Sequence, residues 1–183
     1  MITLVHSLLL SHASALAIGA PPEYTVKGLE KARRFLEMAI QNGYDPSEAQ
    51  RCGDGLYSDL ADCYHALDRD EEAAACYMKL NTINAIIKLG ELSAGQGVGM
   101  SSFERVNIYN NLAEILLSSE TNQSQKAWGY YLIGVMLQDG VGIPQNTDEA
   151  YNSFLKSRDF GSEHAIKMLG RYKKKLFGGY EFR

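Results

Sequence analysis

The hydrophobic residues of this chain recur every three or four positions almost throughout, which is the spacing that gives an α-helix one apolar face. No stretch alternates apolar and polar residues as a half-buried strand would. The spacing breaks at glycines, prolines and short polar runs, which are typical of turns. The pattern predicts nine helices, at about residues 3–18, 26–42, 56–66, 70–80, 83–93, 102–118, 125–138, 146–159 and 162–176.

Several of these helices have recognisable start signals. Ser101 and Glu104 stand three residues apart and can satisfy each other's backbone N–H groups as a capping box. Residues 45–48 have the same signature, with a proline that suits a first helical turn. We also expect Asp68 or Asp70 to cap the helix that follows them, because a carboxylate can accept a free N–H of the first turn.

A repeated motif in the last third of the chain indicates how the helices pack. The pair Ile133-Gly134 returns as Leu169-Gly170, 36 residues later. A period in the thirties that contains two helical runs is typical of a helical repeat array. Because glycine has no side chain, we expect a neighbouring helix to approach closely at Gly134 and at Gly170. Further small residues lie between the two pairs, at Gly140, Gly142, Ala150 and Gly161.

This motif resembles the Sel1-like repeat, a relative of the tetratricopeptide repeat. Earlier segments fit less regularly: Leu89-Gly90 begins one copy, residues 31–43 match a second helix, and residues 60–80 are closer to an ordinary tetratricopeptide motif. The resemblance implies an all-α fold, a right-handed α-α superhelix (solenoid) in a single domain. Its implied parts are about four helix hairpins, at residues 1–43, 45–80, 82–119 and 122–161, and a C-terminal capping helix at residues 162–178.

The resemblance also implies where a partner binds. In related arrays the first helix of each hairpin lines a concave face, on the side of the helix that points away from the apolar-glycine pair. Trp128, Tyr131 and Arg171 are on that side and are of the types that most often anchor interfaces. The full set of expected partner-binding residues is Ser58, Asp62, His65, Ile87, Glu91, Trp128, Tyr131, Val135, Gln138, Lys167 and Arg171.

Composition narrows the classes of function. The 183 residues carry a net charge of −4, which argues against a general nucleic-acid-binding protein. The four histidines and three cysteines show no zinc-site spacing, and the glycines between residues 95 and 99 lack a dinucleotide fingerprint. No nucleophile stands in a recognisable pattern with a base. The sequence therefore predicts no enzyme activity, no cofactor and no metal.

Two local features leave alternatives open. Cys63 and Cys76 fall on consecutive predicted helices, where buried thiols are the favoured interpretation and a disulfide bridge is the alternative. The run of lysines at residues 173–175 is best interpreted as a solvated helix face, with contact to phosphate or to an acidic partner as the alternative.

The N-terminal segment allows two interpretations. Residues 1–20 have an apolar centre followed by small residues, as in a signal peptide, but they lack an initial Lys or Arg. A packed first helix is favoured and predicts a cytoplasmic protein, whereas a cleaved signal peptide would place the protein in the periplasm or outside the cell. The segment is too interrupted to span a membrane. As a helix it would be apolar nearly all round, so a second copy in a homodimer, or another partner, would have to cover it.

Together these observations predict a non-catalytic protein–protein interaction module that binds another protein on its concave face. A more specific alternative, which the resemblance suggests, is an immunity protein that neutralises a secreted bacterial toxin. A secreted effector or adaptor is a further alternative, and an enzyme on a helical scaffold is the least favoured.

Overall fold

A computed structural model describes residues 22–42, 55–95, 99–176 and 178–183 of the chain. The expected helix at residues 3–18 lies outside the described residues, and so do the signal-peptide and homodimer hypotheses that depend on it. The expected helix start at residues 45–48 also lies outside them. The chain divides into two compact units, residues 1–85 and 86–183, and each is considered by itself.

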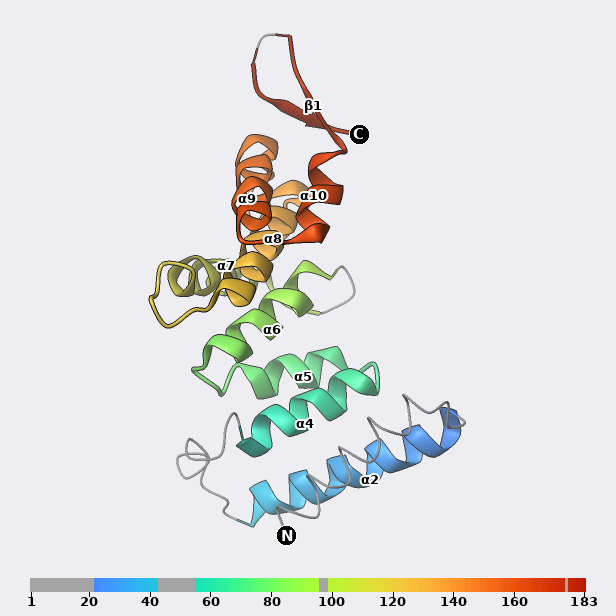
Figure 1. Cartoon of the computed structure of the whole chain (residues 1–183). Coiled ribbons are helices and arrows are strands. Elements are labelled where there is room, and N and C mark those ends of the chain that lie inside the picture. The colour runs from blue at the N-terminus through green and yellow to red at the C-terminus, as the bar shows by residue number, and fades with distance from the viewer. Residues whose placement is uncertain (1–21, 43–54, 96–98, 177) are drawn as a thin grey trace. The chain divides into compact units, whose positions relative to one another are not determined.

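The first unit contains three described helices, α2 (Pro22–Gln41), α4 (Gly55–Ala66) and α5 (Asp70–Tyr77). The helices α4 and α5 form a hairpin, and α2 packs against α4 (Figure 1). The apolar positions that recur along each helix meet between them, as the helical spacing predicts. Buried residues of this core include Leu29, Leu36, Leu60, Cys63 and Tyr77.

The start of α5 differs from the expectation. Arg69 occupies the cap position and makes no capping hydrogen bond, and Asp70 is already the first helical residue. Asp68 has a positive φ of 56° and forms the turn before the helix. The Asp70 carboxylate contacts Nδ1 of His65 at 2.6 Å. The prediction that Asp68 or Asp70 caps α5 was therefore wrong, because the tight turn uses both residues differently.

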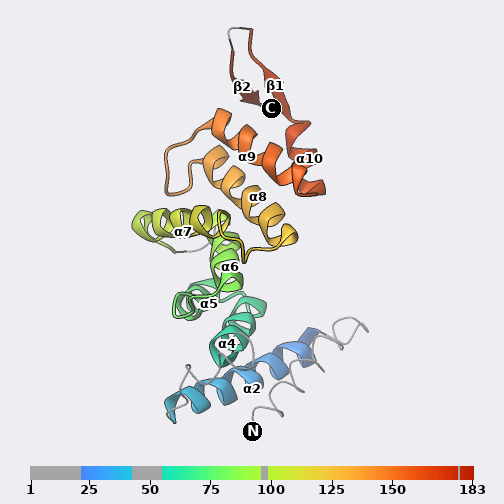
Figure 2. The ribbon, with the colours of Figure 1, turned by 60° about the vertical axis from the view of Figure 1, so that its left-hand side comes forward.

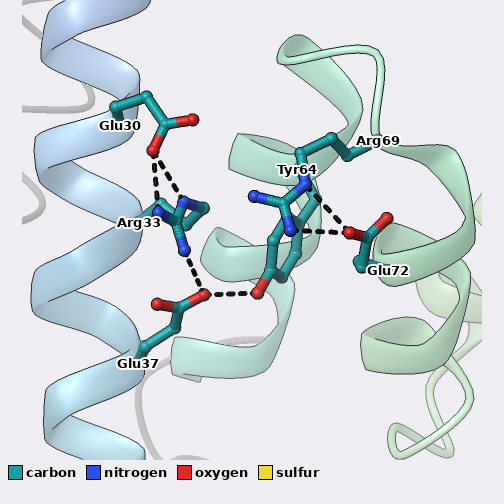
Figure 3. Close-up of polar contacts among 6 residues, drawn as sticks. All are labelled: Glu30, Arg33, Glu37, Tyr64, Arg69 and Glu72. Atoms are coloured by element: carbon teal, nitrogen blue, oxygen red, sulfur yellow. Dashed lines mark hydrogen bonds and ion pairs between the residues drawn. The ribbon is translucent and has the colours of Figure 1, made fainter.

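A chain of polar contacts joins the three helices of this unit (Figure 3). Arg33 on α2 donates to the Glu37 carboxylate at 2.5 Å, and Glu37 also accepts the hydroxyl of Tyr64 on α4 at 2.5 Å. The guanidinium of Arg69 lies 4.8 Å from the centre of the Tyr64 ring. Arg69 also donates to Glu72 on α5 at 2.6 and 2.9 Å. The contacts therefore run from α2 across α4 to α5.

The second unit begins within α6 (Ile83–Ala94) and includes four further helices. The helices α8 and α9 lie side by side as a hairpin, with α7 against α8 and α10 against α9 (Figure 2). The described helices confirm the all-α class that the apolar spacing predicts. The bounds of the four helices are α7 (Ser102–Ile115), α8 (Gln123–Asp139), α9 (Thr147–Asp159) and α10 (Glu163–Leu169).

Capping side chains position the starts of α7 and α8. The Ser101 side chain accepts the N–H of Glu104, and the Glu104 carboxylate accepts the N–H of Ser101 at 2.7 Å. The predicted capping box is therefore confirmed. A second reciprocal box, between Asn122 and Gln125, was not predicted. It starts α8 at Gln123, two residues before the predicted start, because its bonds satisfy the first free N–H groups there.

Glycine permits a close helix crossing at one of the two expected positions. A Cβ atom at Gly134 would lie 2.6 Å from a ring carbon of Phe154, which α9 places against α8. Phe154, Ile133 and Leu137 are all buried. At Gly170, a Cβ atom would meet only backbone oxygens of its own helix among the described residues, the nearer at 3.4 Å. The expectation for Gly170 was therefore wrong, because that glycine follows α10 and no other described helix comes within 4 Å of its Cβ position.

The C-terminal segment also differs from the expected capping helix to residue 176. The helix α10 ends at Leu169, and β1 (Tyr172–Lys174) then pairs antiparallel with β2 (Tyr180–Phe182). Gly178 and Gly179 both have positive φ, at 95° and 77°, which suits the turn between the strands. The helix prediction was therefore wrong in this segment, where the chain forms a short β-hairpin.

Packing on α9 explains why a hairpin forms there. Tyr180 stacks on Tyr151 of α9 with ring centroids 3.6 Å apart, and Tyr172 lies 5.3 Å from the same ring. The backbone N–H of Tyr180 also donates to the carboxylate of Asp148 at 2.7 Å. A continuous helix would separate Tyr172 and Tyr180 by about 12 Å along its axis, so the contact of both rings with Tyr151 requires the chain to turn back on itself and favours a hairpin over a helix.

In the described part of the chain, no helix is both long enough and apolar enough to cross a lipid bilayer.

The two described cysteines lie in the core of the first unit. Cys63 and Cys76 are free thiols and buried, which confirms the favoured interpretation over the disulfide. Burial, together with the nearby Asp59 and Asp62 carboxylates, raises the pKa of the Cys63 thiol to about 12.

Candidate functional site

The second unit gathers aromatic side chains from α8 and α10 beside a carboxylate from α6. Trp128 and Tyr131 are one helical turn apart on α8, and their rings stack with centroids 5.0 Å apart at an interplanar angle of 13°. The indole N–H of Trp128 donates to the Glu91 carboxylate of α6 at 2.6 Å. Lys88 contacts the same carboxylate at 2.9 Å. Both rings are half-buried, so each combines a fixed orientation with accessible surface.

His164 on α10 completes the aromatic group. Its ring lies edge-on to Trp128 at 5.5 Å and to Tyr131 at 5.8 Å between centroids. The other neighbour of Tyr131 is Phe154, 5.7 Å away, which is fully buried in the core of the unit. The rings of Trp128, Tyr131 and His164 therefore contact one another above the buried Phe154, and His164 is the exposed one of the three.

Helix geometry extends this group along both helices. Val135 follows Tyr131 by one turn on α8 and is half-buried. Lys167 follows His164 by three residues on the same side of α10 and is exposed. Arg171, also expected at the binding face, lies beyond the end of α10, and its guanidinium is 4.3 Å from the centre of the Phe182 ring of the hairpin. We call this set, without Arg171, the aromatic surface; its members are Glu91, Trp128, Tyr131, Val135, His164 and Lys167.

Two residues expected at the binding face are instead buried. The side chain of Ile87 is only 7% exposed and belongs to the core. Gln138 is 8% exposed, and its side-chain oxygen accepts the Tyr172 hydroxyl at 3.0 Å. Burial, with the nearby Asp139 carboxylate, raises the pKa of Tyr172 to about 12, so its hydroxyl keeps the proton that it donates. Neither Ile87 nor Gln138 offers surface to a partner, and both are left out of the aromatic surface.

The other three expected residues belong to the first unit. Ser58, Asp62 and His65 lie at intervals of four and three residues on one face of α4. Asp62 accepts the hydroxyl of Tyr77, and Nδ1 of His65 contacts Asp70 at 2.6 Å. These contacts hold the side chains in place on their own unit, and a binding role for them stays a prediction.

One contact in the first unit is of a kind that catalytic sites use. A His–carboxylate contact is half of a nucleophile-activating triad, and His65 with Asp70 makes such a contact. The serine on the same helix face, Ser58, is seven residues away, which is about 10 Å along a helix and beyond hydrogen-bond reach. In the described part of the chain, no three His, Cys, Asp or Glu side chains gather as they would around a metal ion.

Sequence reasoning did not place His164 at this surface. Its position could have been found from the repeat, because His164 follows Trp128 by 36 residues, the interval that separates the two apolar-glycine pairs. It is therefore the counterpart of Trp128 in the next copy. By contrast, no sequence pattern indicates the bond between Glu91 and the Trp128 indole, which joins different helices.

Comparisons with known proteins add one structural likeness. No family model matches the sequence, and no curated protein matches it. Among solved structures, the chain is similar to the crystal structure of a Sel1 repeat protein from Oxalobacter formigenes, with 20% identity and a TM-score of 0.46. The match covers 93% of this chain and 74% of that one. A likeness of this size identifies no function, which has to come from the residues of the site.

Proposed function

We propose that this chain is a non-catalytic module that binds another protein through the aromatic surface. The observation that carries the proposal is the group of Trp128, Tyr131 and His164, held partly open to solvent by packing and by the Glu91 bond. Rigid aromatic rings bury a large area on binding and lose little side-chain entropy, which is why they dominate interface energetics.

The charges around the rings suggest what the partner presents. Glu91 lies at the Trp128 end of the surface, and Lys167 lies on α10. A complementary partner would place an apolar or aromatic side chain on the rings and a carboxylate toward Lys167. Such a charge arrangement sets orientation and the association rate more than it sets affinity.

The test is capture of the partner followed by affinity measurement with purified proteins. The wild-type chain is used to isolate an associated protein from cells that produce it naturally, and mass spectrometry identifies that protein. Tyr131→Ala is expected to weaken its binding about 10- to 100-fold, because an anchoring ring is lost. Lys167→Glu, at an exposed position, is expected to weaken it several-fold without affecting the fold.

Matched controls come from the same unit. Tyr130 is next to Tyr131, stacks on Phe160 at 5.7 Å and does not contribute to the aromatic surface, so Tyr130→Ala controls for a lost tyrosine. Lys156→Glu, on α9, controls for the charge reversal at Lys167. If Tyr131→Ala and Lys167→Glu bind the partner no more weakly than these two controls, the aromatic surface is not the binding site.

The identity of the partner separates the more specific hypotheses. An immunity function predicts that the captured protein is a secreted toxin and that its activity falls when the chain is added. An effector or adaptor function predicts capture of a protein without toxicity. An interaction module of either kind is expected to depend on the same surface residues.

A further inference from the structure

The C-terminal β-hairpin concentrates positive charge in a chain that is acidic as a whole. Residues 171–183 carry five Lys or Arg side chains and one Glu, a net charge of +4, whereas the whole chain carries −4. Lys173, Lys174 and Lys175 are all exposed. Of the described residues, none forms an ion pair with these three lysines. Their charge is therefore not neutralised within the described structure.

An apolar side chain stands next to this charge. Leu176 follows the three lysines at the turn of the hairpin and is 90% exposed, more than any other large apolar side chain of the described residues. The turn is closed by the N–H of Lys175, which donates to the carbonyl of Gly179 at 3.0 Å. Leu176 thus projects from a closed turn, with lysines on the adjoining strand.

The base of the hairpin packs against α9, and these contacts fix where the turn at its other end lies. Tyr180 stacks on Tyr151 at 3.6 Å, and Tyr172 packs 6.0 Å from the buried ring of Phe154. The backbone bond from Tyr180 to Asp148 adds a polar attachment. Only the turn and its lysines extend beyond these contacts, and none of them belongs to the aromatic surface.

We propose that this hairpin binds the surface of an anionic lipid bilayer, with Leu176 entering the interface and Lys173, Lys174 and Lys175 contacting lipid phosphates. A bilayer surface offers both chemistries at adjoining depths, apolar carbon below and negative charge above. A protein partner would need an acidic group and an apolar pocket placed to fit this one hairpin, whereas an anionic bilayer offers both all over its surface. Binding of this kind is weak and reversible, because one apolar side chain and a few cations supply it.

The test is sedimentation of the full chain with lipid vesicles. Vesicles of phosphatidylglycerol and phosphatidylcholine are expected to bind the protein at low salt, and vesicles of phosphatidylcholine alone are not. Each lysine near an anionic surface contributes about fivefold in affinity, so replacing Lys173, Lys174 and Lys175 together by Gln is expected to weaken binding about 100-fold. Leu176→Asn is expected to weaken it several-fold, and Leu176→Trp to strengthen it, because tryptophan favours the interface.

Control variants carry the same changes elsewhere. Lys27, Lys31 and Lys79 are exposed, and their joint replacement by Gln removes as much charge away from the hairpin. Leu117→Asn alters a leucine that is 84% exposed beyond the end of α7. Both controls are expected to bind vesicles as the wild type does. Sedimentation of each variant without vesicles corrects for aggregation, so a gain with Leu176→Trp that requires anionic lipid keeps the test valid if another variant is unstable.

Three results would overturn the proposal. One is that anionic vesicles do not bind the wild-type chain at low salt. Another is that the hairpin variants and their controls bind equally. The third is that soluble polyglutamate binds with the same dependence on the lysines while the changes at Leu176 have no effect, which would assign the hairpin to an acidic protein instead.

Discussion

At the scale of single residues, the crossing of α8 and α9 depends on a position without a side chain on one helix and a large ring on the other. Gly134 leaves a space on α8, and the Phe154 ring of α9 fills it completely. A similar crossing involves Gly90 of α6, where a Cβ atom would lie 2.7 Å from Leu112 of α7. Protein cores are packed as densely as organic crystals, so even one methyl group at such a point forces its neighbours to move.

Replacing Gly134 and Gly170, the glycines of the two apolar-glycine pairs, is expected to affect the free energy of unfolding differently. Gly134→Ala is expected to reduce the free energy of unfolding by about 1–3 kcal/mol, because its methyl group would overlap the Phe154 ring. Gly170→Ala meets only backbone of its own helix, at φ −62°, and is expected to be neutral or slightly stabilising. Urea denaturation of both variants measures the difference. Equal losses of stability would contradict this account of the crossing.

At the scale of elements, α2 is held to the α4–α5 hairpin partly by ionised groups. Glu37 receives hydrogen bonds from Arg33 and from Tyr64, and Glu30 supports Arg33 with bonds of 2.8 and 2.9 Å (Figure 3). Burial by itself would raise the pKa of Glu37, but the Tyr64 hydroxyl and the Arg33 guanidinium lower it below the ordinary value of 4.5. The ionised form is therefore favoured in the folded state.

This lowered pKa makes the attachment of α2 depend on pH. The contribution of Glu37 is complete above about pH 4.5 and is lost as the pH falls through the lower pKa of the folded state. In the wild type, we expect the protection factors of the α2 amides, which correct for the slower intrinsic exchange at low pH, to decrease as the pH falls below about 4.5. In Glu37→Gln this pH-dependent loss of protection is expected to disappear.

A carboxylate outside the network provides the comparison for this prediction. Glu114 is exposed on α7, so Glu114→Gln removes one carboxylate without touching α2. It is expected to leave the pH dependence of α2 exchange as it is in the wild type. If Glu37→Gln and Glu114→Gln change that dependence equally, the effect reflects net charge rather than the Arg33–Glu37–Tyr64 contacts.

Elements also show how far the sequence can be interpreted. The helices were predictable because apolar spacing and capping pairs such as Ser101 and Glu104 act within a few residues. The β-hairpin was not, because residues 171–175 suit a helix locally and only the packing of Tyr180 on α9 makes them extended. In the site, the repeat period indicates Trp128 and Tyr131, whereas the burial of Ile87 and Gln138 depends on neighbours that the spacing does not reveal.

At the scale of the whole molecule, each of the two units has its own buried core. Leu60 and Tyr77 belong to the core of the first, and Phe154 and Met136 to that of the second. In helical arrays, stability is approximately a sum of local terms between adjacent repeats. Damage to one core is therefore expected to reach only the helices that pack on it.

Hydrogen exchange of core variants can test this independence. Phe154→Ala is expected to cost about 3–5 kcal/mol and to remove protection from amides of α8 and α9, because it empties a fully buried site. The amides of α4 and α5 are expected to keep their wild-type protection. Leu60→Ala, in the core of the first unit, is expected to give the converse pattern. Loss of protection throughout the chain in both variants would instead show that the two units unfold together.

The Glu91 bond to Trp128 has a practical consequence. Trp128 is the single tryptophan of the 183 residues, so the intrinsic fluorescence of the protein comes chiefly from the middle of the aromatic surface. A molecule that docks there would alter the solvent around the indole, and its arrival would change the emission spectrum of unlabelled protein. Binding at the aromatic surface can therefore be followed by tryptophan fluorescence of the unlabelled chain.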